Sequence, residues 1–205
     1  MIIKKTKTLV NKRYQVISKI LNKIPPESIG VELGVWSGEL SLYLLSIIKN
    51  IKKIYLIDPW KKYNNEEYID SINDCDQEYY NCIYNCLIDN ISKNYPKRAE
   101  VLRGISEDFE NKFQDNSLNF IYIDANNLYD QVIKDIEIWY PKLKSGGILF
   151  GNNFIEDGYY VWQKDSNGNP ICYGEYGVKS AVRVFCKKNN ISYQALDENQ
   201  WLINK

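Results

Sequence analysis

The sequence predicts an α/β fold built on an open, mostly parallel sheet with helices on both faces. Strand-like apolar runs alternate with helix-like runs along most of the 205 residues, and this alternation is typical of parallel crossover units. The run 28–33 leads through Gly34 and Gly38 into a helical pattern. Two closing strand-like runs, 191–196 and 200–204, are separated by Asp-Glu-Asn, which predicts an antiparallel hairpin at the end of the sheet.

The first half of the chain predicts a strand–helix–strand unit behind a leading helix. Residues 7–23 carry apolar positions at helical spacing, and the two prolines that follow would terminate this helix. A strand, a helix and a second strand come next, in the order that a parallel crossover requires. A polar, aromatic stretch then precedes a longer helical pattern. These segments are the strand 28–33, the helix 37–48, the strand 53–58, the aromatic stretch 60–76 and the helix 77–94.

The second half continues the alternation until a glycine-rich segment interrupts it. Ser145-Gly-Gly is expected to form a turn before the fifth strand. Residues 158–177 contain four glycines and several tyrosines, which predicts a long loop or irregular hairpin that acts as a lid over one end of the sheet. The other segments are the strand 99–104, the short helix 106–113, the strand 118–124, the helix 129–143, the strand 148–151 and the helix 178–189.

The chain is expected to form one domain. Its length and its hydrophobic content of 44% are sufficient for a single sizeable core. Residues 1–28 are expected to be an N-terminal helical extension, and residues 29–205 the domain itself, with the lid-like insertion at about 157–177.

Composition excludes several classes of function. The chain contains no histidine, which removes Ser-His-Asp hydrolysis, Cys-His catalysis and imidazole-ligated metal sites. The 26 basic and 26 acidic residues balance, so no net field favours nucleic acid or an anionic membrane. No apolar run approaches the roughly 20 residues that cross a bilayer, the start lacks a signal peptide's apolar stretch, and the five cysteines are irregularly spaced. We therefore expect an intracellular, cytoplasmic protein with reduced thiols and with neither a nucleic acid nor a membrane partner.

Acidic residues close three of the predicted strands. Glu32, Asp58 and Asp124 end the first, second and fourth strands, and the carboxyl ends of parallel strands meet at one edge of a sheet. The glycines after Glu32 allow the backbone to come close to a ligand, and a carboxylate there can accept hydrogen bonds from a nucleoside-type cofactor. Each acid alone also suits an ordinary turn. Together they predict a ligand site at this edge.

Several ordered motifs resemble the class I S-adenosylmethionine-dependent methyltransferases. The matching segments are 31–41, the run Tyr-Leu-Ile-Asp-Pro-Trp at 55–60, the run Leu-Arg-Gly-Ile-Ser at 102–106, and the long stretch from Phe120 to Gly151. The resemblance is closest to sugar and small-molecule O-methyltransferases of the macrocin O-methyltransferase kind and more distant to catechol O-methyltransferase. It covers nearly the whole chain from Ile29. It implies a Rossmann-like, doubly wound, mostly parallel seven-stranded sheet with a C-terminal antiparallel hairpin.

The resemblance implies a site for S-adenosylmethionine. Glu32 and the glycine loop would hold the methionine part, and Asp58 the ribose hydroxyls. Ser106 and Glu107 would lie beside the adenine. Trp60 would pack on the cofactor or at the substrate entrance, with a core aromatic as the open alternative. The implied cofactor-binding set is Glu32, Gly34, Trp36, Gly38, Asp58, Trp60, Ser106, Glu107 and Asp124.

The same resemblance raises the question of a divalent cation. Many relatives use one to lower the pKa of the acceptor hydroxyl, through a histidine after the fourth strand and an acidic pair after the fifth. Here residues 124–129 read Asp-Ala-Asn-Asn-Leu-Tyr and residues 151–154 read Gly-Asn-Asn-Phe. The remaining metal candidates are Asp124, Asn152 and Asn153, and one carboxylate with neutral oxygens binds Mg²⁺ more weakly than two or three carboxylates.

Two further assignments depend on that question. Glu156 or Asp157 is the alternative source of the missing negative charge for Mg²⁺. Without a cation, Asp124 would be the general base and Tyr129 an orienting hydroxyl.

The favoured hypothesis is a methyltransferase that acts on a hydroxyl of a sugar or another polar small molecule. A cofactor-binding pseudoenzyme or scaffold is its rival, because asparagines replace catalytic residues. A nicotinamide-dependent oxidoreductase is a third hypothesis, although the loop lacks a full Gly-x-Gly-x-x-Gly. The aromatic segments 60–76 and 158–177 would form the acceptor pocket by stacking on a carbohydrate ring, or would make contacts in a homodimer.

Overall fold

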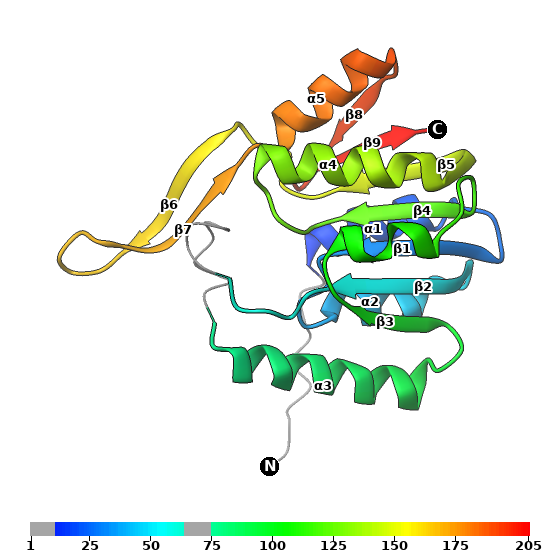
Figure 1. Cartoon of the computed structure of the whole chain (residues 1–205), viewed down its shortest axis with the longest axis horizontal. Coiled ribbons are helices and arrows are strands. Elements are labelled where there is room, and N and C mark those ends of the chain that lie inside the picture. Colours follow the sequence, from blue (N-terminus) through cyan, green and yellow to red (C-terminus); the bar gives the residue numbers. More distant parts are fainter. Residues whose placement is uncertain (1–10, 64–74) are drawn as a thin grey trace.

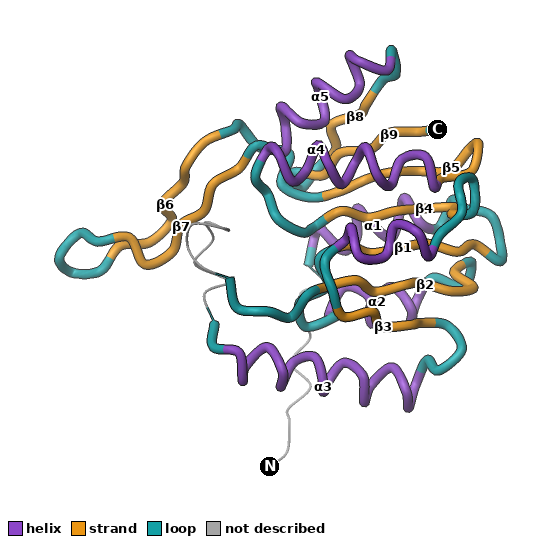
Figure 2. Tube along the Cα trace, viewed as in Figure 1, coloured by secondary structure: helices purple, strands orange, loops and turns teal. Residues whose placement is uncertain are grey.

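The protein has a seven-stranded sheet with helices on both faces and a separate hairpin that projects from one edge (Figure 1, Figure 2). The computed structural model describes residues 11–63 and 75–205. The strands follow the order β3-β2-β1-β4-β5-β9-β8. Strands β1 to β5 are parallel, whereas β9 runs antiparallel to both β5 and β8. The predicted doubly wound sheet with a closing antiparallel hairpin is confirmed.

Most elements lie where the sequence predicts them. The strands are β1 (Ser28–Leu33), β2 (Ile51–Asp58), β3 (Ala99–Arg103), β4 (Leu118–Ile123), β5 (Leu143–Gly151), β8 (Tyr193–Leu196) and β9 (Gln200–Asn204). The helices are α1 (Lys12–Leu21), α2 (Glu39–Ile47), α3 (Gln77–Asn94), α4 (Tyr129–Trp139) and α5 (Val178–Asn189), with short 3₁₀ helices η2 (Ser106–Lys112) and η3 (Tyr140–Lys142). The part of the leading helix expected at 7–10 lies outside the described residues, as do residues 64–74 of the aromatic stretch.

One expectation needs correction, and one alternative is settled. The expected turn at Ser145-Gly-Gly is part of β5, because the amide of Gly146 donates to the carbonyl of Lys205 at 2.8 Å and that of Lys205 to Gly147 at 3.0 Å. This part of β5 therefore pairs with Lys205, a partner that the local turn residues do not predict. Of the two alternatives expected at 158–177, a long loop or an irregular hairpin, the hairpin is observed: β6 (Gly158–Lys164) and β7 (Pro170–Tyr176) pair antiparallel, with register shifts on either side of Gln163. Its role as a lid stays a prediction.

Two apolar cores cover the opposite faces of the sheet. On one face, α1, α2 and α3 pack around residues such as Ile17, Leu44 and Phe120. On the other face, α4 and α5 pack around residues such as Trp139 and Val182. Alternate residues of each strand point to opposite faces, so the central strands must be apolar on both sides. The two cores fix the strand ends at which the acidic residues lie.

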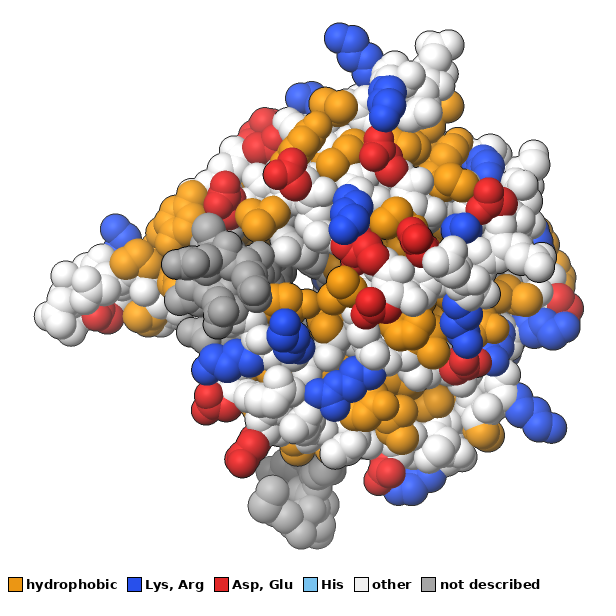
Figure 3. Space-filling model, in the orientation of Figure 1, with side chains coloured by type: hydrophobic (Ala, Val, Ile, Leu, Met, Phe, Trp, Pro, Cys, Tyr) orange, Lys and Arg blue, Asp and Glu red, His pale blue; other side chains and the backbone are white. Residues whose placement is uncertain are grey.

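All five cysteines are free thiols. Charged side chains of both signs are interspersed on the face shown in Figure 3. Among the described residues, no helix has both the length and the apolar character needed to cross a bilayer.

Candidate functional site

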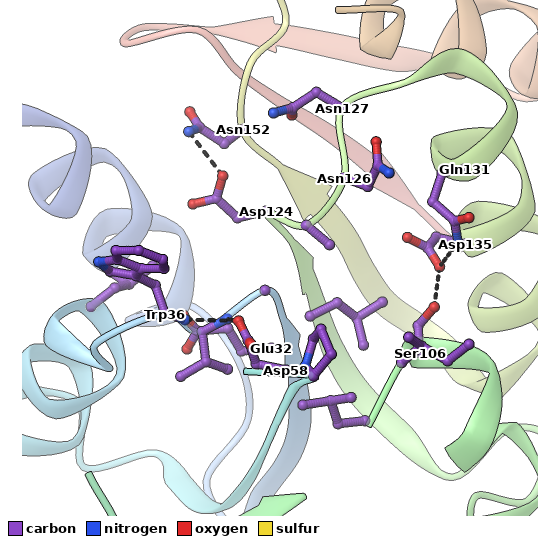
Figure 4. Close-up of a pocket in the computed structure, with 18 of the residues that line it drawn as sticks. Glu32, Trp36, Asp58, Ser106, Asp124, Asn126, Asn127, Gln131, Asp135 and Asn152 are labelled. Carbon is purple, nitrogen blue, oxygen red and sulfur yellow. Dashed lines mark hydrogen bonds between the residues drawn. The ribbon is translucent and has the colours of Figure 1, made fainter. Parts of the chain in front are cut away.

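A cleft of about 570 Å³ opens at the carboxyl ends of β1, β2 and β4. Its volume lies within the range of small-molecule and cofactor sites. The side chains come from the loops that follow β1 to β5, from α4, and from α1 at the mouth. Figure 4 shows them in three groups: Glu32, Trp36 and Asp58 at the base, Ser106, Gln131 and Asp135 on one wall, and Asp124 with Asn126, Asn127 and Asn152 on the opposite wall.

The loop after β1 is shaped by Gly34 and Asp58. Gly34 has φ +82°, and a Cβ there would lie 2.1 Å from the backbone oxygen of Asp124, so only glycine fits. Asp58 Oδ2 accepts from the backbone amides of Val35 and Trp36, both at 2.9 Å, and Oδ1 accepts from that of Trp60 at 2.7 Å. These bonds hold Trp36 at φ 53°, a left-handed conformation that is uncommon for a bulky residue. Burial raises the pKa of Asp58, and the three backbone bonds oppose that effect.

Glu32 is a buried acid at the end of β1. The residue is 2% exposed, and its Oε2 accepts from the Ser41 hydroxyl at 2.5 Å. Burial disfavours the charged carboxylate and raises the pKa of Glu32 to about 8, although the bond from Ser41 lowers it. At neutral pH the carboxyl therefore holds a proton that a nearby positive charge could displace.

A second acidic group joins η2 to α4. The Ser106 hydroxyl contacts Asp135 Oδ1 and, at 2.8 Å, Glu107 Oε2. Because a hydroxyl carries one hydrogen, both contacts are satisfied only when one of the two carboxyls is protonated and donates to Ser106, and Asp135 has the higher pKa of the two. This agrees with burial, which raises the pKa of Asp135 to about 7. Although burial opposes it, hydrogen bonds from Lys134, Ser106 and Gln131 lower the pKa of Glu107 to about 2.

Asp135 also carries a free acceptor at the cleft. The residue is 1% exposed and lines the cleft, and its Oδ2 has no hydrogen-bond partner within the described part of the chain. An unsatisfied buried polar atom costs free energy unless a ligand or water satisfies it. This wall is therefore suited to a ligand with a hydrogen-bond donor.

Asp124 lies at the end of β4 between an arginine and an asparagine. Its Oδ2 accepts from Arg13 Nη1 at 2.8 Å and its Oδ1 from Asn152 Nδ2 at 3.1 Å. Burial raises the pKa of Asp124, while Arg13 and Asn152 lower it. Asn152 Oδ1 in turn accepts from Gln200 Nε2 at 2.5 Å. Both carboxylate oxygens are thus engaged by donors.

The expected cation ligands line the same cleft, but they do not turn their oxygens toward one another. Asn152 presents its amide nitrogen, not its oxygen, to Asp124, and Asn153 Nδ2 donates to Asn127 Oδ1 at 2.9 Å. Glu156, the alternative source of charge, pairs with Lys179 on α5. In residues 11–63 and 75–205, no group of three or more His, Cys, Asp or Glu side chains could hold a metal ion. A guanidinium at 2.8 Å from Asp124 would also repel a divalent cation.

The cleft gathers most of the residues expected from the sequence. Those that line it are Glu32, Gly34, Trp36, Asp58, Ser106, Glu107, Asp124, Asn152 and Asn153. The expected convergence of residues 32, 58 and 106 on one site is therefore observed.

Three expected residues do not line it. Gly38 is the N-cap of α2 at φ +75°, and a Cβ there would meet Leu87 of α3. Trp60 is fully buried and donates from Nε1 to the carbonyl of Trp36 at 2.8 Å, so it is a core aromatic that supports the loop. Tyr129 is 37% exposed at the start of α4, where its backbone packs closely against Gly177.

Sequence reasoning missed Arg13, Gln131 and Asp135. Asp135 carries a usable signal, because it lies among the apolar positions of α4, next to the buried Ile136. An acid on the apolar face of a helix needs a partner or a function. Arg13 gave no such signal, since nothing in its local pattern shows that α1 packs at the mouth of the cleft.

The comparisons with known proteins agree with this geometry. A family model described as a methyltransferase domain matches residues 31–154. A search of curated proteins gives no match. Similar solved structures include a protein assigned as a caffeoyl-CoA O-methyltransferase from Staphylococcus aureus, with 15% identity, a TM-score of 0.60, and coverage of 96% of this chain and 85% of that chain.

Two other solved structures have the same fold. A SAM-dependent methyltransferase from Aquifex aeolicus has 16% identity and a TM-score of 0.54, with coverage of 93% of this chain and 87% of that chain. TrmK from M. capricolum, in complex with S-adenosyl-homocysteine, has 14% identity and a TM-score of 0.55, with coverage of 96% and 69%. At these identities the likeness concerns the fold.

Proposed function

Because this chain belongs to the methyltransferase-domain family, we propose that it transfers a methyl group from S-adenosylmethionine to a hydroxyl of a sugar or another polar small molecule. The observation that supports this most directly is the cleft itself, where the loops after β1, β2, β3 and β4 bring Glu32, Asp58, Ser106 and Asp124 together. Open parallel sheets bind ligands at this edge, near the switch in strand order between β1 and β4. The macrocin O-methyltransferase-like branch stays a prediction.

The charge of the cleft fits this cofactor. Its acidic lining residues are Glu32, Glu39, Asp58, Glu107, Asp124 and Asp135, against the basic Arg13 and Lys61. A cleft with excess acidic groups favours a cationic ligand, and S-adenosylmethionine carries a sulfonium and an ammonium group. When bound, it supplies a methyl group that is already activated for transfer. Glu32 at the base is then the natural counter-charge.

The nucleoside part would lie between Asp58 and the Ser106 wall. The Asp58 carboxylate can accept about four hydrogen bonds. Three come from backbone amides of the loop, which leaves one position for a ribose hydroxyl. The free Oδ2 of Asp135 can accept from the exocyclic amine of adenine. Asp58 therefore has two tasks, because it shapes the loop and contacts the ligand.

The acceptor would lie on the Asp124 wall. Asn126, Asn127, Asn152 and Asn153 surround Asp124 there and offer the donors and acceptors that a hydroxyl-rich molecule needs. The rings that line the cleft can pack on a sugar ring, and they belong to Tyr14, Trp36, Tyr63, Tyr80 and Tyr176. Asp124 is the candidate base for the hydroxyl proton, because burial raises its pKa. We place the reaction in the cytoplasm, in keeping with the five free thiols.

A cofactor-binding scaffold without turnover is the second candidate. It is favoured by the engagement of both Asp124 oxygens with Arg13 and Asn152, because these donors lower the pKa of Asp124 and so weaken it as a base. Transfer of labelled methyl from S-adenosylmethionine to glucose, inositol and catechol separates the two. Binding of the cofactor with no product from any hydroxyl compound would favour the scaffold.

Cofactor binding is tested by calorimetry with S-adenosylmethionine, S-adenosylhomocysteine and NAD. We expect binding of the first two and none of NAD. Ser106→Ala should weaken S-adenosylhomocysteine binding about tenfold, because it removes the hydroxyl that orients Asp135. Ser92→Ala is the matched control, since that exposed hydroxyl donates to the carbonyl of Asp89 on α3 and does not line the cleft. Preferential binding of NAD, or equal effects of the two variants, would contradict the assignment.

A further inference from the structure

Arg13 reaches the acceptor wall from outside the parallel unit. It lies on α1, whose Ile17 and Leu21 are fully buried in the core shared with α2 and α3. The N-cap Asn11 accepts from the Arg13 amide at 3.0 Å, which fixes the first turn of the helix. The guanidinium is therefore held on a rigid element at the mouth of the cleft.

The guanidinium is only partly used by the protein. One bond joins Nη1 to Asp124 Oδ2 at 2.8 Å, the guanidinium carbon lies 5.6 Å from the centroid of the Tyr14 ring, and the Arg13 side chain is 25% exposed. Its Nε is buried and has no hydrogen-bond partner among the described residues. A guanidinium carries five N–H donors, so Arg13 can bind an oxygen of a ligand while it keeps the bond to Asp124. Figure 4 shows Asp124 facing into the same cleft.

The guanidinium lies where a divalent cation would otherwise contact Asp124. The oxygens of Asp124 are engaged by Arg13 and Asn152, and Asn152 and Asn153 turn amide nitrogens toward their neighbours. The donor set therefore fits a fixed cation from the chain and does not fit a bound divalent ion. A fixed guanidinium stabilises negative charge on an oxygen in a cleft where water is partly excluded.

We propose that Arg13 binds the acceptor's reacting oxygen and takes the role that a divalent cation has in related enzymes, so that methyl transfer here is independent of metal. The proposal rests on the proposed function. Arg13 then contacts the substrate, and Asp124 both positions Arg13 and receives the proton. The acceptor is accordingly a hydroxyl whose oxygen gains negative charge beside a guanidinium.

The step balances with the groups present. The acceptor oxygen forms a bond to the methyl carbon while the carbon–sulfur bond breaks, with its electron pair left on sulfur. The hydroxyl proton passes to the carboxylate of Asp124. The positive charge lost from sulfur matches the negative charge lost from Asp124, and Arg13 stays protonated throughout.

Arg13→Gln, Arg13→Lys and the control Lys12→Gln test this proposal. Lys12 is the exposed neighbour on α1, so its replacement removes the same charge away from the cleft. We expect Arg13→Gln to lower kcat about 100-fold, Arg13→Lys to retain part of it, and Lys12→Gln to leave it unchanged. Wild-type activity should persist in EDTA. S-adenosylhomocysteine affinity should be unchanged in all three variants.

Binding measurements keep this test separate from the proposed function. Titration of Mg²⁺ into the wild-type complex with S-adenosylhomocysteine should give no binding heat, and this readout needs no turnover. Mg²⁺ binding that Asp124→Asn abolishes, activity that EDTA removes and Mg²⁺ restores, or a wild-type kcat in Arg13→Gln would each overturn the role of Arg13. Failure of the wild type to bind S-adenosylhomocysteine would instead refute the proposed function.

Discussion

At the scale of single residues, Glu32 shows how burial prepares a group for a charged ligand. It ends a strand that is apolar on both faces, and the fold leaves its carboxyl almost without solvent. The Ser41 hydroxyl supplies one hydrogen bond, which does not compensate for the lost hydration. A neutral carboxyl at the base of the cleft is the result.

Binding of S-adenosylmethionine should therefore release a proton from Glu32. The pKa of the unliganded group is about 8, and an adjacent sulfonium favours the ionised form. Affinity should rise as pH increases from 6 to 8, by at most about tenfold per pH unit. Calorimetry in two buffers of different ionisation enthalpy measures the released proton. Glu32→Gln is the control and should remove the pH dependence, whereas affinity that falls over this range would refute the assignment.

Part of the site could be predicted from single residues and part could not. Glu32, Asp58 and Asp124 each end a strand, and the parallel arrangement alone brings such ends together. Trp60 was ambiguous, because an aromatic after a strand suits a core as well as a ligand, and here it packs on Tyr84 with ring centroids 5.0 Å apart. Arg13 lies 111 positions from Asp124. A contact between residues so far apart in the sequence depends on tertiary packing, which local sequence patterns do not predict.

At the scale of elements, helices with a clear apolar period were predicted best. The bounds of α3 and α5 agree with the apolar spacing because each packs one face on the sheet and ends at a polar turn. Elements whose partners are remote were predicted worst. The early start of β5 depends on Lys205, which is remote from it in the sequence.

The β6–β7 hairpin can be shortened to test the lid. Tyr160 pairs with Gly174, so residues 161–173 can be replaced by Asn-Gly, which suits a two-residue turn. The removed segment includes the exposed Trp162 and Ile171 and projects from the body (Figure 1). Folding and S-adenosylhomocysteine affinity should be unchanged. If the hairpin closes over the acceptor, KM for the acceptor should rise on the order of tenfold, as expected for lost ring contacts.

The shortened variant retains Tyr176. It lies at the base of the hairpin and lines the cleft. A changed KM reports on the projecting part together with the contact that Trp162 makes with Tyr176, whose ring centroids lie 5.8 Å apart. An unchanged KM would show that the hairpin is not a lid.

At the scale of the whole molecule, the sheet concentrates buried acids at one edge. Glu32 lies at the base of the cleft and Asp135 on one wall, and burial raises the pKa of each, to about 8 and about 7. The chain has no histidine, so ordinary side chains contribute little titration between pH 5.5 and 8. The stability of the protein in this range should therefore report mainly on these two carboxyls.

The sign of this pH dependence follows from proton binding. Between the unfolded pKa values near 4 and the folded values of about 7 and 8, the native state binds more protons than the unfolded state. The free energy of unfolding without ligand should therefore fall as pH rises from 5.5 to 8, on the order of 1 kcal/mol per pH unit for each carboxyl that is still protonated. Urea unfolding at four pH values measures this slope. Asp135→Asn should flatten the slope below pH 7, and Glu32→Gln should flatten it up to pH 8. Glu137, which pairs with Lys188 on the surface, provides the control, and Glu137→Gln should leave the slope unchanged. A wild-type stability that rises over this range would show that the two carboxyls are ionised in the native protein. Glu32 would then release no proton when the cofactor binds.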